Sequence, residues 1–405
     1  MPAEIMSSSG PRTVSASAND LTVAAYISFV PIGIATVLLG PLLPTLSARW
    51  SLNYAEAGAL FTAQYIASTI AVALSGVVVS WRGYRFAMES GILLMSVGLA
   101  LVLLGPKWLG ILCIAVYGGG IGIAVPAANL MVAELNPARR AATLNWLNFY
   151  WSAGAVSCPF LVAAATKTHR LPLFLAMVSA FSLLVAAGIF RMPADLSASV
   201  SSNSGRITLL PLIRSKLRVF LILAALFFIY VGTENGFGGW VASFAKSLGS
   251  LSPVMSLITP SFFYASLMLG RWLAPFLLRA DTEVRLVRWG LLLACGGTAG
   301  LLWSHGLVGV LVSACAAGFG LSYVYPITIA LLSKEFGSAS SRIGSVMFVL
   351  SNIGGGLFPW IVGLVSNRTG TLKTGLLVPL FGCALMLILY LQQWDRPQLA
   401  ASNAE

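Results

Sequence analysis

One carboxylate stands out in this chain because of its surroundings. Glu234 is the only acidic residue well inside a long apolar run of sequence. A lone carboxylate in hydrocarbon is costly, so it must face a cavity, meet a cation or hold a proton. We therefore expect Glu234 to bind and release a driving proton, or to help bind sodium. The alternative is a hydrogen-bonded structural glutamate that orders the glycine-rich segment after it.

Amide, phenol and indole side chains inside the apolar runs could bind a hydroxylated solute. Amides offer donors and acceptors that match the mixed hydroxyls of a sugar, and an indole can stack on a sugar ring. Asn145 and Asn148 are three residues apart and share a helix face. The candidate substrate-binding residues are Gln64, Asn145, Asn148, Asn235, Trp240, Tyr264, Tyr325 and Asn352. Each of these side chains could instead pack between helices or form a hydrogen bond between them. Such a hydrogen bond stabilises the contact by about 0.6 kcal/mol.

Charged residues recur at matching helix ends in the two halves of the chain. Acidic residues followed closely by arginines can form ion pairs that hold one end of a helix bundle closed. The candidate gating residues are Glu134, Arg139, Arg140, Glu335 and Arg342. Simple anchoring at a membrane surface is the alternative. Arg271, the one basic residue inside a span, could reach the surface or pair with Glu335.

Other kinds of chemistry find no support in the sequence. The five cysteines lack metal-ligand spacing, and both histidines fall in predicted loops. The glycine runs near Gly120 and Gly355 lack the Lys-Ser/Thr pair of a phosphate-binding loop. The net charge of +12 comes from residues scattered between apolar runs. We expect no catalytic residues, no metal, no cofactor and no nucleic-acid partner.

Membrane-spanning helices must position the polar candidates. Only 9% of the 405 residues are charged and 58% are hydrophobic, whereas about a quarter of a soluble domain is charged. A helix needs about 20 apolar residues to cross the hydrocarbon core. This length predicts twelve spans, at about 21–47, 54–80, 85–105, 108–134, 140–165, 171–191, 217–246, 254–279, 285–304, 306–334, 341–365 and 372–393.

The basic residues orient these spans. If the N-terminus is inside, the inner side carries sixteen Lys and Arg residues and the outer side seven. Because basic residues concentrate in cytoplasmic loops, we expect both termini in the cytoplasm.

The two halves of the chain look duplicated. Gly120-Ile121-Gly122 recurs as Gly318-Phe319-Gly320, and Pro126 recurs as Pro326. Six helices return a chain to its starting side, so two such halves are parallel repeats. We predict an all-α transmembrane fold, a twelve-helix bundle of two parallel six-helix halves. Its parts are a disordered cytoplasmic tail (1–20), the first half (21–191), a cytoplasmic linker (192–216), the second half (217–393) and a cytoplasmic tail (394–405).

Six plus six helices around a basic central loop resemble the major facilitator superfamily over almost the whole chain. Three stretches also resemble the fucose:proton symporter family, which includes bacterial glucose and mannose symporters. They are Phe61-Thr62-Ala63-Gln64-Tyr65, the run from Pro126 through Asn145 and Asn148 to Ala155, and Tyr230-Val231-Gly232-Thr233-Glu234-Asn235-Gly236-Phe237-Gly238-Gly239-Trp240. The resemblance implies a monosaccharide as substrate.

The sequence departs from these families at two places. Ser80 stands where the loop motif of the superfamily has an Asp. The fucose symporter is understood to carry protons on carboxylates in its first and fourth helices. Here the first span has no acidic residue, and Val125 occupies the matching place in the fourth. Proton coupling in that form is therefore not implied.

We expect a secondary active transporter that moves a small polar solute across the plasma membrane by alternating access. A monosaccharide is the leading candidate for the substrate, with a proton as the coupling ion. The alternatives are an uncoupled or sodium-coupled facilitator and an exporter of amphipathic compounds. An enzyme would need a converging catalytic set, which the sequence lacks. Beyond the substrate and the ion, the expected partner is the lipid bilayer of a bacterial inner membrane. We expect the protein to be a monomer.

Overall fold

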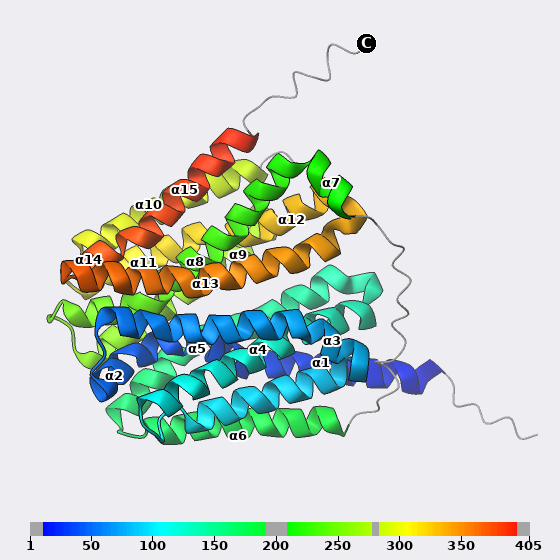
Figure 1. Cartoon of the computed structure of the whole chain (residues 1–405), viewed down its shortest axis with the longest axis horizontal. Helices are drawn as coiled ribbons and strands as arrows, with labels where there is room; N and C mark the ends of the chain where they lie inside the picture. Colours follow the sequence, from blue (N-terminus) through cyan, green and yellow to red (C-terminus); the bar gives the residue numbers. More distant parts are fainter. Residues whose placement is uncertain (1–10, 192–208, 278–282, 395–405) are drawn as a thin grey trace, which may run out of the picture.

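The computed structural model describes residues 11–191, 209–277 and 283–394, and every element assigned in these ranges is a helix. The helices run roughly side by side in two bundles, one from each half of the chain (Figure 1). The predicted all-α fold of two six-helix halves is confirmed.

The first half holds α1 (Pro11–Val37), α2 (Leu39–Trp50), α3 (Tyr54–Leu101), α4 (Lys107–Leu135), η1 (Pro137–Arg139), α5 (Arg140–Lys167) and α6 (Leu171–Phe190). The second half holds α7 (Leu209–Ser215), α8 (Leu217–Ser247), α9 (Pro253–Leu277), α10 (Glu283–Trp303), α11 (Leu307–Leu321), α12 (Val324–Phe336), η3 (Gly337–Ala339), α13 (Ser340–Thr369), α14 (Leu372–Gly375) and α15 (Leu377–Trp394).

Twelve membrane crossings follow from these helices. Within the described ranges, 11 helices are long and apolar enough to cross a membrane, and one of them is α3 with 48 residues. Gly83 lies inside α3 with φ 81° and ψ 172°, which is not helical. This residue turns the chain and divides α3 into two crossings.

Proline explains three breaks that the spans did not predict. The chain leaves helical hydrogen bonding between α1 and α2, between α11 and α12, and between α14 and α15. A proline follows each break: Pro41 follows the first, Pro326 the second and Pro379 the third. In each case the residue four positions before the proline lies at the break or next to it. Proline lacks the N–H that would bond that carbonyl, so the helix opens there.

Two predicted irregular segments contain helix. Residues 11–20 begin α1, although the sequence predicted a disordered tail. Extending an existing helix costs far less than starting one, so the long apolar helix continues into this Ser/Ala-rich stretch. Residues 209–215 of the predicted linker form α7, because Leu212 and Ile213 pack against the hydrophobic core. Residues 1–10, 192–208 and 395–405 lie outside the described ranges.

Equivalent glycines pack equivalent helices in the two halves. A side chain at Gly120 would collide with the backbone of Gly91 and Met95, and one at Gly320 with Gly290 and Ala294. The structural partner of Gly320 is therefore Gly120, not Gly122. The predicted duplication holds, but the partner of Gly320 in the first half lies two residues before the one that the sequence match gave.

The two halves meet at one end of the bundle. We call the end where α1 begins and α15 finishes the terminal end, and the opposite end, around Asn53, the far end. Gly58 of α3 lies against the Pro359 carbonyl of α13, where an added Cβ would be 2.9 Å from that oxygen. Gly40 of α2 approaches the backbone of Gly238 in α8 in the same way.

Hydrogen bonds between the halves also lie toward the far end. Thr62 Oγ1 donates to the Gly356 carbonyl at 3.3 Å, and Ser261 Oγ donates to the Val156 carbonyl at 2.9 Å. These bonds lie between mid-depth and the far end. From there the halves diverge toward the terminal end, on the right of Figure 1. We call this set of contacts the far-end seam.

The turn at Gly83 should be sensitive to substitution. Gly83→Ala should destabilise the protein by about 1–3 kcal/mol, because only glycine adopts this backbone conformation without strain. Thermal unfolding in detergent measures the change. Gly76→Ala, in a helix with open space around it, is the control and should be neutral or slightly stabilising. Equal losses for both variants would contradict the strain at Gly83.

Candidate functional site

An ion pair lies at mid-depth in the second half. Glu234 falls midway along α8, and its Oε2 is 3.9 Å from Nη2 of Arg271 on α9. The same Nη2 donates to the hydroxyl of Tyr230 at 3.0 Å. The glutamate side chain is 10% exposed and the arginine side chain 22%. A cation therefore stands beside Glu234, and the expectation that Arg271 reaches Glu335 is wrong.

Aromatic hydroxyls surround this ion pair. The phenols of Tyr65, Tyr230, Tyr264 and Tyr325 lie within electrostatic range of the Glu234 carboxylate. The rings of Tyr230 and Tyr325 lie 5.4 Å apart, centroid to centroid. Tyr264 comes from α9 and Tyr325 from α12, so three helices of the second half contribute. The predicted candidates Glu234, Tyr264 and Tyr325 thus form one cluster.

A hydrogen bond joins this cluster to the first half. The Tyr65 hydroxyl of α3 donates to Asn235 Oδ1 of α8 at 2.8 Å, while Asn235 Nδ2 donates to the Val231 carbonyl. On the other side of α3, the Tyr117 hydroxyl donates to Gln64 Oε1 at 3.2 Å. Asn235 therefore lies where the halves meet, and Gln64 is held within the first half.

Three predicted amides lie apart from the ion pair. Asn145 and Asn148 are exposed on α5, and Asn148 Nδ2 donates to the Leu144 carbonyl of its own helix at 2.9 Å. Asn352 is half-buried on α13. No contact among the described residues joins these amides to Glu234 or Asn235.

Trp240 packs within the far-end seam. Its side chain is 1% exposed, and its Nε1 donates to the Pro359 carbonyl at 2.9 Å. The ring also meets Tyr54 of the first half edge-on, with centroids 6.2 Å apart. In this conformation Trp240 joins helices and has no free face for a solute.

Two of the predicted gating residues, Glu134 and Glu335, bind partners within their own halves. Glu134 accepts a hydrogen bond of 2.8 Å from the Tyr84 hydroxyl. Lys216 Nζ donates to Glu335, at 2.7 Å to the backbone carbonyl and 3.3 Å to Oε2. Arg139 is exposed, and the side chains of Arg140 and Arg342 lie outside the described part of the chain. Among the described side chains, neither acid pairs with Arg139, and the pairing with Arg140 and Arg342 stays a prediction.

Three members of the central cluster were not among the predicted site residues: Tyr65, Tyr230 and Arg271. Arg271 carried a usable signal, since it is the one basic residue inside a predicted span. A buried cation needs an anion, and Glu234 is the acid at matching depth. The two tyrosines offered no such signal.

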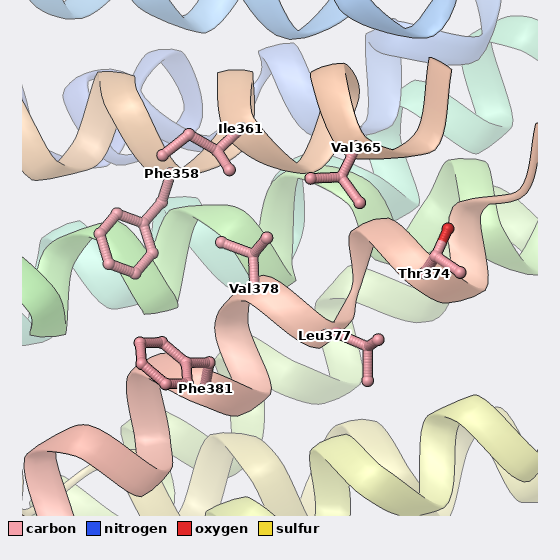
Figure 2. Close-up of a pocket in the computed structure, with 7 residues that line it drawn as sticks. All are labelled: Phe358, Ile361, Val365, Thr374, Leu377, Val378 and Phe381. Atoms are coloured by element: carbon pink, nitrogen blue, oxygen red, sulfur yellow. The ribbon is translucent and has the colours of Figure 1, made fainter. Parts of the chain in front are cut away.

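An apolar groove lies away from this cluster. It has a volume of about 440 Å³ and is lined by Phe358, Ile361, Val365, Thr374, Leu377, Val378 and Phe381. Figure 2 shows side chains from α13 facing those from α14 and α15 across it. Phe381 is 68% exposed, as expected of a lipid-facing surface. The groove contains no predicted site residue.

Known proteins resemble the chain over most of its length. The sequence profile of the Major Facilitator Superfamily matches residues 25–359. The TsgA homolog of Serratia proteamaculans is 24% identical over 91% of this chain and 94% of its own length. The glucose/mannose transporter GlcP of Bacillus subtilis is 21% identical over 86% of this chain and 88% of its own.

A solved structure gives the same fold. FucP, the E. coli fucose:proton symporter, superposes in its outward conformation with a TM-score of 0.64 and 19% identity, over 92% of this chain and 98% of its own. With twelve crossings, two duplicated halves and a profile match over most of the sequence, the chain belongs to the major facilitator superfamily and is a multi-pass membrane transporter of small solutes, not an enzyme.

Proposed function

We propose that this protein is a proton-coupled monosaccharide transporter of a bacterial inner membrane. The cluster around Glu234 carries the proposal, because it places a carboxylate, a guanidinium, an amide and phenols at mid-depth. Carriers of this architecture bind their substrate there, and these groups match the donors and acceptors of a sugar. The similarity to a glucose/mannose transporter supports the choice of a sugar.

The far-end seam supports transport by alternating access. One end of the bundle is closed by backbone contacts at glycines, and the halves diverge toward the other end (Figure 1). The excess of basic residues supports a cytoplasmic terminal end, and with that orientation this conformation faces inward. The opposite state requires the far-end seam to open.

Glu234 is the proposed proton carrier. It lies beside Asn235, which bonds to Tyr65 of the first half, so a change at Glu234 can affect the contact between the halves. In the outward-facing state, Glu134, Arg139, Arg140, Glu335 and Arg342 would close the terminal end. Asn145, Asn148 and Asn352 would meet the solute from the other helices.

Uptake by reconstituted protein tests the proposal. Proteoliposomes with an inward proton gradient should accumulate a radiolabelled hexose or pentose, and a protonophore should abolish this accumulation. Accumulation driven by sodium alone would favour a sodium-coupled carrier. If no monosaccharide enters above the level of protein-free liposomes, the sugar assignment is wrong.

Glu234→Gln should separate coupling from transport. The variant keeps a hydrogen-bonding side chain but cannot cycle a proton, so accumulation should be lost while exchange of labelled sugar across the membrane continues. Glu283→Gln, at the start of α10 and remote from the cluster, is the matched control and should behave as wild type. Normal accumulation by Glu234→Gln would remove the coupling role.

The bond between Tyr65 and Asn235 should favour the closed far end. Tyr65→Phe removes this bond, which is worth about 0.5–1.5 kcal/mol, so the far-end-closed population should fall relative to the open one by up to about tenfold. Spin labels at Lys167 and Met255, both exposed near the far end, report the distance between the halves. Tyr54→Phe serves as the control. Identical distance distributions in wild type and Tyr65→Phe would contradict this role.

A further inference from the structure

Arg271 has hydrogen-bonding capacity that the protein leaves unused. A guanidinium carries five N–H donors, yet the described contacts of Arg271 are one hydrogen bond to Tyr230 and one ion pair with Glu234. That ion pair measures 3.9 Å, whereas charge-assisted hydrogen bonds measure about 2.7–2.9 Å. Glu234 therefore balances the charge of Arg271 without filling its hydrogen-bonding sites.

The unused donors of Arg271 are not fully buried. Nε and Nη1 of Arg271 make no hydrogen bond, and they are absent from the fully buried, partnerless polar atoms of the described residues. An unpaired guanidinium edge turned to hydrocarbon at this depth is costly. We therefore expect the accessible edge to face a solvated region between the halves, where a solute would approach.

We infer that Arg271 binds the carboxylate of an acidic monosaccharide, such as a uronate or an aldonate; this inference rests on the proposed proton-coupled sugar transport. The planar fork of Arg matches both oxygens of a carboxylate. The amide of Asn235 and the phenols of Tyr230 and Tyr325 lie close by and suit the hydroxyls of the same solute.

Exchange of partners explains why an acid is favoured over a neutral sugar. A neutral sugar would leave Arg271 paired with Glu234, so Glu234 would take up a proton less readily than it does when an acid binds. A carboxylate on Arg271 displaces Glu234 and leaves it without a counter-ion in a low-dielectric region. Glu234 then takes a proton from the water on the open side. One anion and one proton move together, so the net charge of the site is unchanged.

The groups that face Glu234 support this exchange. They are Tyr65 on α3, Tyr230 on α8, Tyr264 and Arg271 on α9, and Tyr325 on α12. The four phenols are neutral at physiological pH, so Arg271 is the only cation among these described groups and no second cation can replace it.

Ionisable groups on the other elements that pack against α8 lie elsewhere. Some of these groups are near the ends of the bundle, and the others contact residues outside the cluster. The groups are Arg49, Arg214, Cys315, Lys334, Glu335, Arg368, Lys373, Cys383 and Tyr390. In the described part of the chain, the charge balance of Glu234 therefore depends on Arg271.

Calorimetric titration of the full-length protein in detergent tests the inference. Glucuronate and glucose are titrated near neutral pH in two buffers of different ionisation enthalpy, which counts the protons taken up on binding. Wild type should bind glucuronate at least about tenfold more tightly than glucose, with about one proton taken up per anion. Glu234→Gln should bind glucuronate without proton uptake.

Variants of the arginine identify the residue responsible. Arg271→Lys keeps a cation beside Glu234 but lacks the fork, so glucuronate affinity should fall at least about tenfold while the unfolding midpoint stays near that of wild type. Arg271→Gln should lose glucuronate binding. Arg285→Gln removes an exposed arginine at the start of α10 and should change neither.

Different outcomes overturn different claims. Glucuronate affinity that is unchanged in both Arg271→Lys and Arg271→Gln would overturn the inference. So would tight, proton-linked binding of glucose with no binding of glucuronate, although proton-coupled sugar transport would then stand. If glucuronate binds with one proton but proteoliposomes transport neither sugar, the proposed function fails and the binding role of Arg271 survives.

Discussion

A charge inside a bilayer must meet an opposite charge, water or a proton, and this constraint organises the centre of the molecule. Glu234 satisfies it with Arg271, at a distance that balances charge without closing a short hydrogen bond. Because the pair is loose, we expect that another anion can replace Glu234 beside Arg271 at a modest cost. A proton can likewise replace Arg271 as the partner of Glu234. The phenol of Tyr230 accepts a hydrogen bond from Arg271 without adding charge. A site of this kind can change its protonation state while the helices around it stay packed.

The far-end seam links this site to the shape of the whole bundle. Glycines allow α2 and α3 of one half to touch α8 and α13 of the other through backbone atoms, so the contact is close but contains few polar bonds. Tyr65 and Asn235 form the polar bond nearest the site, one residue from Glu234. In the proposed mechanism, a solute that binds beside Glu234 would therefore also act on the contact between the halves. The duplicated packing of Gly120 and Gly320 gives each half its own firm interior, as the proposed alternating access requires.

The sequence could predict features that depend on length and composition. The hydrophobic length of most spans located their helices to within a few residues, so α13 begins at Ser340 where the span predicted 341. It could not predict which way each side chain faces, because rotation of a helix about its axis depends on all of its neighbours. Trp240 is buried for this reason, and the partner of Arg271 was missed for the same reason. The positions of Asn145 and Asn148 depend further on which end of the bundle is closed, and composition does not encode that.

The central claim is that Glu234 is ionised beside Arg271 in the empty transporter and becomes protonated when a solute binds. Infrared difference spectroscopy measures this directly, because a protonated carboxyl group has a carbonyl band that a carboxylate lacks. Addition of a transported monosaccharide should produce this band in wild type and not in the Glu234→Gln variant. A spectrum without the band, or a band that persists in the variant, would contradict the account.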